Sequence, residues 1–438
     1  MALAACSSTE PAKPKVGKEP PVALVAGPQR PTLAQGDTKL SELIENAPTS
    51  VIAGERLNVE LLRRFYARHG FAPVWTTRQG QANSLIDAVS RAGEHGLSPE
   101  LFHASLLQSP TVSELDRELL LSDAFLSYAD ALARGYMPLE RRRDDHALTP
   151  DSIDIAVVLD TAMGSPDPAL VIEALAPTTP TYRLLRQALK DGRAGGTTAR
   201  LREIAVNLER ERWLPRHLPA DRVWVNAADE RLVLYRDDRP VFTTRVIVGQ
   251  DDVRNQSPEF EVPITAVWFN PPWNIPNDIA TNELLPKARL DPTYLAKRNI
   301  VMLPDGSLQQ KAGAGSGLGQ LIFEMTNRFD VYLHDTPGKH LFSLNGRRIS
   351  HGCIRVENPQ QLAALLMRQP IDDINETIKT GDTLRRTLPQ PVPVFVVYET
   401  AFADADGKLQ YRPDSYRRDA AIWKYLDPKS RAVTVAER

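Results

Sequence analysis

The sequence predicts an α+β protein in which an all-helical domain precedes a mainly β domain with helical insertions. Between about residues 40 and 191, apolar residues recur three and four positions apart, which is typical of amphipathic helices. A glycine-rich segment at 192–198 interrupts this pattern, and from about residue 222 apolar and polar residues alternate as they do in strands. Helices and strands that are segregated along the chain favour the α+β class.

Residues 1–37 are expected to form a tether rather than a folded domain, because they contain six prolines and few large apolar residues. Leu3-Ala4-Ala5-Cys6 resembles a bacterial lipobox, so Cys6 is a candidate for lipidation; a chance match is the alternative. Only five residues precede Cys6, fewer than a secretory signal needs, and we expect the natural start to lie upstream or to have been removed. The serine that follows Cys6 favours the outer membrane over the inner one.

The helical domain is assigned to residues 38–195. Helices are expected where an apolar stripe is followed by a residue that ends a helix, or where a proline begins one. These segments are 59–69, 82–95, 113–134, 168–176 and 182–189. Such stripes indicate a packed core far more often than a ligand site.

The second domain is assigned to residues 196–403, and a C-terminal hairpin and helix to 404–438. After a short helix at 199–214, strands are expected at 222–226, 232–236, 241–248, 264–270, 321–325, 330–334 and 392–402. Asp237-Asp238 is a candidate turn between two of them. A short helix at 278–285 should end at Pro286, and Asn358-Pro359 should begin another.

Charge and cysteine content exclude several classes of protein. Lys+Arg number 53 and Asp+Glu 55, a net charge of −2, which gives no electrostatic reason to expect a nucleic acid partner. The two cysteines, Cys6 and Cys353, lie far apart, so a disulfide framework is improbable. There is no C-x-x-C pair and no nucleotide, flavin or metal motif, so we expect no cofactor and no metal.

The residues that suggest chemistry are concentrated in one short stretch. Three of the eight histidines, His334, His340 and His351, fall within eighteen residues, and Cys353 follows in Ser350-His351-Gly352-Cys353-Ile354-Arg355. A protonated imidazole stabilises a thiolate, which can attack a carbonyl and form a thioester. On this basis the pKa of the thiol should be lowered and activity should rise with pH. A buried, inert cysteine is the alternative, and a zinc site is disfavoured by the spacing.

The wider pattern resembles the L,D-transpeptidase (YkuD-type) family. His334-Asp335-Thr336-Pro337 is followed, with fifteen residues between His334 and Ser350, by the Ser-His-Gly-Cys-Ile-Arg segment. Segments around Asn207, Trp273, Tyr332 and Tyr398 resemble the YcbB-like branch, so that the resemblance covers roughly residues 40–420. It implies a helical scaffold domain, a YkuD-like β-sandwich catalytic domain and a capping region at about 276–319 that ends in a mobile glycine-rich loop.

The resemblance also implies roles for the residues of the motif. Cys353 matches the nucleophile and His334 the general base, with the carbonyl of Asp335 orienting the imidazole. Ser350 and His351 match residues that shape the nucleophile loop. The amides of Gly352 and Cys353 match the oxyanion hole.

Three further residues are candidates for binding the substrate. Arg355 matches the position that holds the loop or a substrate carboxylate, although a structural ion pair is an equal alternative. Trp273 and Tyr332 are expected at the substrate groove, and a core tryptophan is as consistent with Trp273. His340 matches nothing essential and should lie on the surface.

The family implies a periplasmic enzyme acting on peptidoglycan stem peptides, without a cofactor, that forms a thioester with diaminopimelate, releases D-Ala and transfers the acyl group to an amine. The acceptor is left open: another stem in a 3-3 cross-link, an outer-membrane protein, or water, as in an amidase or carboxypeptidase. An inactive wall-binding scaffold is the alternative from another class. The chain lacks the peptidoglycan-binding module usually inserted in this branch, because 190–200 is too short to hold it.

Overall fold

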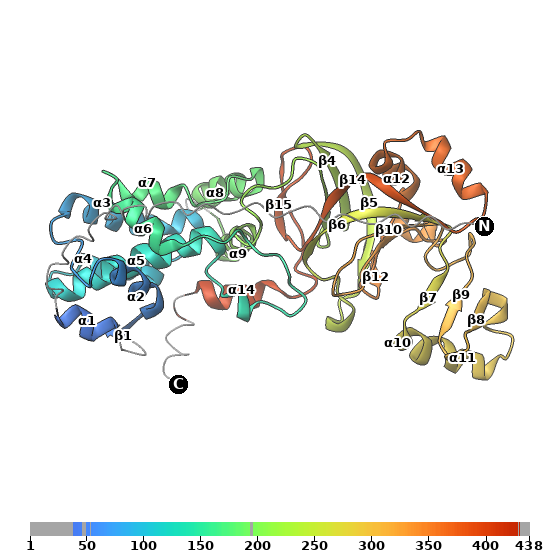
Figure 1. Cartoon of the computed structure of the whole chain (residues 1–438), viewed down its shortest axis with the longest axis horizontal. Helices are drawn as coiled ribbons and strands as arrows, with labels where there is room; N and C mark the ends of the chain where they lie inside the picture. Colours follow the sequence, from blue (N-terminus) through green and yellow to red (C-terminus); the bar gives the residue numbers. More distant parts are fainter. Residues whose placement is uncertain (1–37, 46–49, 53, 193–195, 428, 430–438) are drawn as a thin grey trace, which may run out of the picture.

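The computed structural model describes residues 38–45, 50–52, 54–192, 196–427 and 429. The molecule is elongated, with a helical half at one end, a curved sheet in the middle and a small lobe at the other end (Figure 1). The lipobox at Cys6 and the tether lie outside the described residues. Among the helices that are described, none is both long and apolar enough to cross a membrane.

The helical half is built on one core, which surrounds the long helix α5 (Glu114–Arg134). Around it lie α2 (Val59–Arg68), α3 (Gln79–Ser90), α6 (Ile155–Met163), α7 (Pro168–Glu173), α8 (Pro180–Gly192) and α9 (Thr198–Glu211). Side chains of Asn58, Ser113 and Asp154 cap three of these helices by accepting from backbone amides. The predicted helices are present, although the one expected at 82–95 ends at Ser90 and is followed by a 3-10 turn. Helices α1 (Thr38–Ile44), α4 (Ala104–Gln108) and α6 were not predicted, and α9, assigned to the second domain, belongs to the helical core.

The second half is a nine-stranded sheet in the order β12-β5-β13-β11-β10-β6-β14-β3-β4, and β4 also pairs with β5. The expected β-sandwich is therefore formed by a single sheet, which closes on itself through the pairing of β4 with β5. Its strands are β3 (Arg222–Asn226), β4 (Arg231–Arg236), β5 (Arg239–Gly249), β6 (Phe260–Phe269), β10 (Leu321–Glu324), β11 (Leu333–His334), β12 (Arg348–Ser350), β13 (Ile354–Val356) and β14 (Leu384–Val397). Asp237 and Asp238 form the predicted turn between β4 and β5, both with positive φ.

The strand expected at 392–402 differs most from the structure. It begins earlier, at Leu384, and ends at Val397; β15 (Ala401–Ala403) then pairs with β16 (Leu409–Tyr411). The first part of β14 escaped prediction because prolines follow it. Pro389 and Pro391 lie between Thr387 and Val392, where the pairing of β14 with β6 is irregular. Because the strands are not in register there, the missing proline amides remove no hydrogen bond from the sheet.

The capping region forms a separate lobe with its own small core. Strands β7 (Trp273–Ile275), β9 (Leu308–Gln310) and β8 (Ile300–Met302) form a sheet in that order, against the helical run α10 (Asn277–Ile279), a π-helical turn (Ala280–Leu284) and α11 (Leu285–Leu290). The prediction that Pro286 ends this helix was wrong. Pro286 is the second residue of α11, directly after the π-helical turn, and the helical run continues past the proline to Leu290.

The C-terminal segment returns to the helical half. Helix α14 (Asp419–Leu426) packs against α9, and Ala401, Ile422 and Leu426 belong to the helical core. The last part of the chain therefore joins the two halves (Figure 1). Helices α12 (Pro359–Met367) and α13 (Ile371–Lys379) cover the other end of the sheet, and α12 begins at Pro359 as predicted.

Candidate active site

The segment Ser350–Cys353 forms a tight turn between β12 and β13. The hydroxyl of Ser350 donates to the carbonyl of Cys353 at 2.6 Å and accepts from the amide of Gly352 at 3.2 Å. Gly352 has a φ of 110°, a conformation that side chains rarely adopt. The serine and the glycine of the motif thus shape the turn that presents Cys353.

Strand register brings the predicted site residues together. β11 and β13 run parallel, with Leu333 beside Ile354 and His334 beside Arg355. Leu333 and Ile354 point into the core of the sheet. Because side chains alternate along a strand, His334, Arg355 and, just before each strand, Tyr332 and Cys353 lie on the opposite face.

His334 is buried, and its Nδ1 lies 2.5 Å from the carbonyl of Asp335. A carbonyl can only accept, so Nδ1 carries the hydrogen, and in the neutral ring Nε2 keeps the lone pair. The backbone of Leu318 also faces this imidazole. Burial and the nearby charge of Arg355 lower the pKa of His334 to about 4. The imidazole is therefore neutral at neutral pH, as a general base requires.

Cys353 is half-buried, with its Sγ 3.8 Å from the carbonyl oxygen of Asp330. Burial raises the pKa of its thiol above the ordinary value, against the lowering effects of the Tyr332 backbone and the Arg355 charge. The expectation of a lowered thiol pKa was wrong, because burial of the thiol outweighs these lowering effects. Burial therefore favours the neutral forms of both the thiol and the imidazole.

The oxyanion hole differs from the expectation in one donor. The amide of Gly352 already bonds to the Ser350 hydroxyl. The amide of Cys353 has no acceptor among the described residues. An oxyanion formed at Cys353 would therefore meet that amide first, since an uncommitted donor needs no rearrangement to serve it.

Arg355 carries a positive charge beside both reactive groups. The charge acts on the pKa of His334 and of Cys353, and burial lowers the pKa of the guanidinium itself. No ion-pair partner for it occurs among the described residues, and its buried Nε has no hydrogen-bond acceptor there. The structural ion pair considered as an alternative is absent from this part of the chain, which leaves Arg355 available to an anionic ligand.

The glycine-rich loop 313–319 lies against two of the predicted residues. A side chain at Gly319 would meet the carboxylate of Asp335, and one at Gly317 would meet the ring of Trp273. Asp335 Oδ2 accepts from the amide of Gln320 at 2.9 Å, so this carboxylate fixes the end of the loop. Trp273 also packs on the core of the lobe, so the structure gives it a structural role.

The outer side of the nucleophile turn contacts the capping lobe. His351 Nε2 lies 2.7 Å from Glu283 Oε1, and both side chains are partly exposed, at 34% and 42%. His340 is exposed, as predicted. Within the described residues, no group of three or more His, Cys, Asp or Glu side chains is arranged to hold a metal ion.

Sequence reasoning missed three residues that contact this site. Glu283 pairs with His351, Ser257 bonds to the carbonyl of Gly352, and Lys339 bonds to the Asp335 carboxylate at 2.6 Å. Lys339 lies four residues after Asp335, a spacing that could have been noticed. Glu283 and Ser257 are remote in sequence from their partners and carry no such signal.

Comparison with known proteins agrees with this arrangement. A profile of the Scaffold domain matches residues 60–189, and a profile of the L,D-transpeptidase catalytic domain (YkuD) matches residues 220–394. A provisionally named L,D-transpeptidase of Haemophilus influenzae is 29% identical over 395 residues, which cover 83% of this chain and 78% of that protein.

Two solved structures were also found, one described as the Ldtfm-avibactam carbamoyl enzyme and one a mutant of the Enterococcus faecium L,D-transpeptidase. They are 12% and 11% identical, cover 41% of this chain, and give a TM-score of 0.21. The chain spans about half the length of each, 49% and 50%. At these scores they bear on neither the fold nor the activity of this chain.

The two profiles follow each other in the order in which the helical half and the closed sheet occur along the chain. The Haemophilus influenzae relative spans both. The chain therefore contains a YkuD L,D-transpeptidase catalytic domain behind an N-terminal Scaffold domain.

Proposed function

We propose that the chain is a peptidoglycan L,D-transpeptidase whose Cys353 forms a thioester with the diaminopimelate carbonyl of a tetrapeptide stem. The observation that carries the proposal is the register of β11 and β13, which gathers His334, Cys353 and Arg355 on one face. A thiol, a neutral base and an unpaired cation at one place are what thiol acyl transfer to an anionic peptide requires.

Acylation begins when His334 Nε2 takes the proton of the Cys353 thiol as Sγ attacks the carbonyl of the third stem residue. The oxyanion is stabilised by the amide of Cys353. Collapse breaks the bond to D-Ala, whose amine receives the proton from His334. The product is a thioester, and D-Ala leaves.

Transfer repeats these steps in reverse order. The side-chain amine of a neighbouring stem attacks the thioester and gives a proton to His334. The carbon–sulfur bond then breaks, and His334 returns the proton to Cys353. Two third-position residues become joined in a 3-3 cross-link.

Arg355 supports the choice of an anionic substrate, because it is half-buried and has no ion-pair partner among the described residues. A carboxylate of the stem would satisfy its donors, and guanidinium–carboxylate pairs combine affinity with orientation. Tyr332 lies beside Cys353 on the same face and would line the groove. Trp273 contributes through the capping lobe, under the glycine-rich loop.

The acceptor is proposed to be an amine rather than water. The capping lobe contacts the nucleophile turn through Glu283 and lies over Asp335 through the glycine-rich loop. A lobe in this position would shield the thioester from water, which favours transfer over hydrolysis. Attachment of an outer-membrane protein would use the same thioester with a different amine.

The test is mass spectrometry of the products after incubation with disaccharide-tetrapeptide, with Cys353→Ala as the control. A Cys353-dependent dimer that lacks one D-Ala is the expected product. Tripeptide alone would show hydrolysis and would overturn transfer between stems under these conditions. A protein with no Cys353-dependent product and no acyl adduct would be an inactive wall-binding scaffold.

We also propose that the enzyme acts in the periplasm and is anchored to the outer membrane through a lipid on Cys6. The support is the lipobox-like start and the proline-rich segment behind it. Metabolic labelling with a palmitate analogue, in cells that express the full-length gene, tests this. A Cys6-dependent label is expected, and its absence would refute the anchor.

A further inference from the structure

The nucleophile turn, Ser350–Cys353, is hydrogen-bonded to a serine that lies outside the sequence motif. Ser257 is fully buried, and its hydroxyl donates to the carbonyl of Gly352 at 2.8 Å. The same hydroxyl accepts from the amide of Gly249, at the end of β5, at 3.0 Å. One side chain thus joins the turn that presents Cys353 to the strand beside it.

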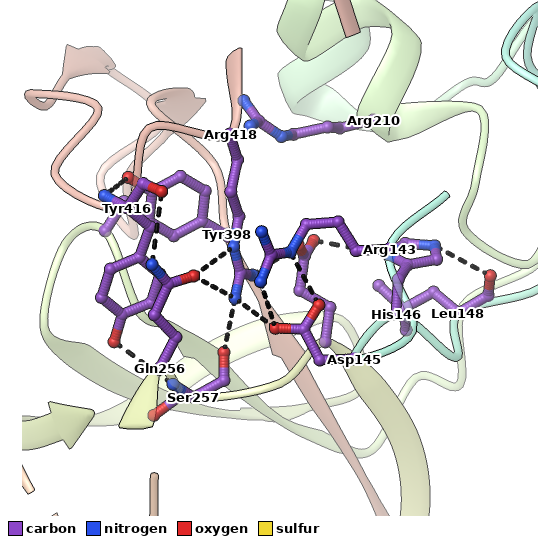
Figure 2. A network of polar contacts seen from close by, with 12 residues as sticks. Arg143, Asp145, His146, Leu148, Arg210, Gln256, Ser257, Tyr398, Tyr416 and Arg418 are labelled. Atoms are coloured by element: carbon purple, nitrogen blue, oxygen red, sulfur yellow. Dashed lines mark hydrogen bonds and ion pairs between the residues drawn. The ribbon is translucent and has the colours of Figure 1, made fainter. Parts of the chain in front are cut away.

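Ser257 is in turn held by Arg418, from the C-terminal segment. Arg418 Nη2 donates to the carbonyl of Ser257 at 3.1 Å, and Nη2 and Nε bond to Gln256 Oε1 at 3.0 and 3.2 Å. Figure 2 shows Arg418 at the centre of this network. Tyr416 adds a second support, because its hydroxyl donates to the carbonyl of Gly249 at 2.7 Å.

The network reaches the helical half through Asp145, while a second carboxylate, Glu259, directly precedes β6. Arg418 Nη2 pairs with Asp145 at 2.8 Å and Nη1 with Glu259 at 2.7 Å. Asp145 lies in the segment that leaves the helical half, and its carbonyl accepts from the amide of Glu259. The side chain of Arg418 is 2% exposed, so its charge depends on these partners.

Burial gives this network a fixed geometry. A buried donor or acceptor that loses its partner is penalised, so the hydroxyl of Ser257 has few alternatives to its two bonds. The backbone of Gln256 also lies against Gly352, where a side chain on the glycine would approach the Gln256 carbonyl at 3.6 Å. The position of the Gly352–Cys353 peptide is therefore set by Ser257 and Gln256 as well as by Ser350.

We propose that Ser257 is a positioning residue for the nucleophile turn, held in place by Arg418 and so by the C-terminal segment and the helical half. Ser257 touches neither substrate nor thiol; it acts through the carbonyl of Gly352, which belongs to the same peptide unit as the Cys353 amide. This inference rests on the proposed function, in which that amide binds the oxyanion. It also assigns a positioning task to Arg418, which lies beyond the matched catalytic profile of residues 220–394.

The test compares Ser257→Ala with Ser122→Ala. Ser122 is also fully buried, and its hydroxyl makes two bonds, to Tyr66 and Trp75, within the helical core. Two rates are measured for each variant: acylation of Cys353 by tetrapeptide, from the intact-mass shift, and alkylation of Cys353 by iodoacetamide. Acylation needs the oxyanion hole, whereas alkylation does not.

Ser257→Ala should lower the acylation rate constant by roughly 10- to 100-fold, since small misplacements of reacting groups have effects of this size. KM and the alkylation rate should change less than about threefold. Ser122→Ala should leave both rates near those of the wild-type protein. Equal acylation by Ser257→Ala and the wild-type protein would overturn the inference. A wild-type protein that is never acylated would instead refute the proposed function.

Arg418→Lys tests the second link. Lysine keeps the charge but cannot span Gln256, Ser257 and both carboxylates, because it lacks the planar fork of donors. We expect acylation to fall while alkylation is retained in the folded variant, with folding checked by circular dichroism. A folded Arg418→Lys protein with wild-type acylation would show that Arg418 does not hold Ser257 for catalysis.

Discussion

The two sides of the nucleophile turn are built differently. On one side, here called the lower side, Ser257 and Arg418 are buried and make hydrogen bonds and ion pairs that reach the helical half. On the other, upper side, a partly exposed contact between His351 Nε2 and Glu283 Oε1 joins the turn to the capping lobe. The lower side has bonds whose loss would leave buried groups unpaired, whereas the upper side can exchange its pair for water.

This difference suggests a division of tasks. A turn that presents a nucleophile needs a fixed geometry, which the lower side provides. A site that admits two peptide stems must also open, and a lobe held by the exposed His351–Glu283 contact and a glycine-rich loop can do so at little cost. Three of the four predictions below test this division and one tests the reactive pair itself; they begin with the largest expected effect.

The first prediction compares the stability of two variants. Arg418→Ala leaves the buried Glu259 without its guanidinium partner, whereas Asp145 keeps Arg143, so the free energy of unfolding should fall by about 3–5 kcal/mol. Glu283→Gln removes an exposed pair and should change it by less than about 1 kcal/mol. Urea unfolding followed by circular dichroism measures both. Similar losses in the two variants would contradict the division.

The second prediction concerns hydrogen exchange of the wild-type protein. Amides of the capping lobe, residues 273–319, should exchange at least about 100-fold faster than those of 246–249 and 354–356, which lie in central strands of the closed sheet. The lobe has a core of only five buried apolar residues among those described, and it can open without unfolding the sheet. Mass spectrometry of peptides after timed exchange gives the rates. Equal protection would mean that the lobe and the sheet open together.

The third prediction is a pH profile that distinguishes a neutral pair from a thiolate–imidazolium pair. The pKa of His334 is about 4 and that of Cys353 is raised, both chiefly through burial. As the pH falls below about 4, the imidazole gains a proton and can no longer act as the base, so the acylation rate should drop about tenfold per pH unit. Between about pH 5 and 8 the rate should be nearly constant.

The profile is measured as the rate of the mass shift on Cys353 with tetrapeptide, which avoids the titration of an acceptor amine. Alkylation by iodoacetamide, followed over the same range, reports the thiolate directly and should still be rising at about pH 9. An inflection of both rates near about pH 6.5 would show that the two groups exchange a proton before substrate binds.

Much of the site could be predicted because its residues lie close together in sequence. The alternation around His334 indicated a strand, and the motif around Cys353 indicated a turn, so their joint placement followed from the resemblance. The direction of the thiol pKa could not be predicted. Proximity of histidine argued for a lowered value, but burial of both groups acts in the opposite direction, and burial is known only once the sheet has closed.

The contacts beneath and above the turn could not be predicted for another reason. Ser257 is 95 residues from Gly352, and nothing distinguishes it from other loop serines. Its role depends on the end of β5, and on a C-terminal segment that returns to the helical half. Glu283 is equally hidden, because it lies in a π-helical turn that the sequence suggested would be an ordinary helix ending at Pro286.

The smallest expected effect is that of Glu283→Gln on the fate of the thioester. The substitution keeps the shape of the side chain but removes the charge that His351 faces across 2.7 Å. Because an exposed pair contributes at most about 1 kcal/mol, the lobe should open a few times more often. The acylation rate should change little, since Ser257 and Arg418 still fix the nucleophile turn.

Hydrolysis should gain relative to transfer, because water enters when the lobe opens. The ratio of tripeptide to 3-3 dimer, measured by mass spectrometry at equal acceptor concentration, should rise about two- to fivefold in Glu283→Gln, within the range that loss of such a pair allows. Glu376→Gln, which removes another exposed ion pair on α13, away from the turn, is the matched control. An equal rise of this ratio in both variants would show that the contact between His351 and Glu283 does not control access of water to the thioester. A fall in acylation of Glu283→Gln as large as that expected for Ser257→Ala would show instead that the upper side also fixes the nucleophile.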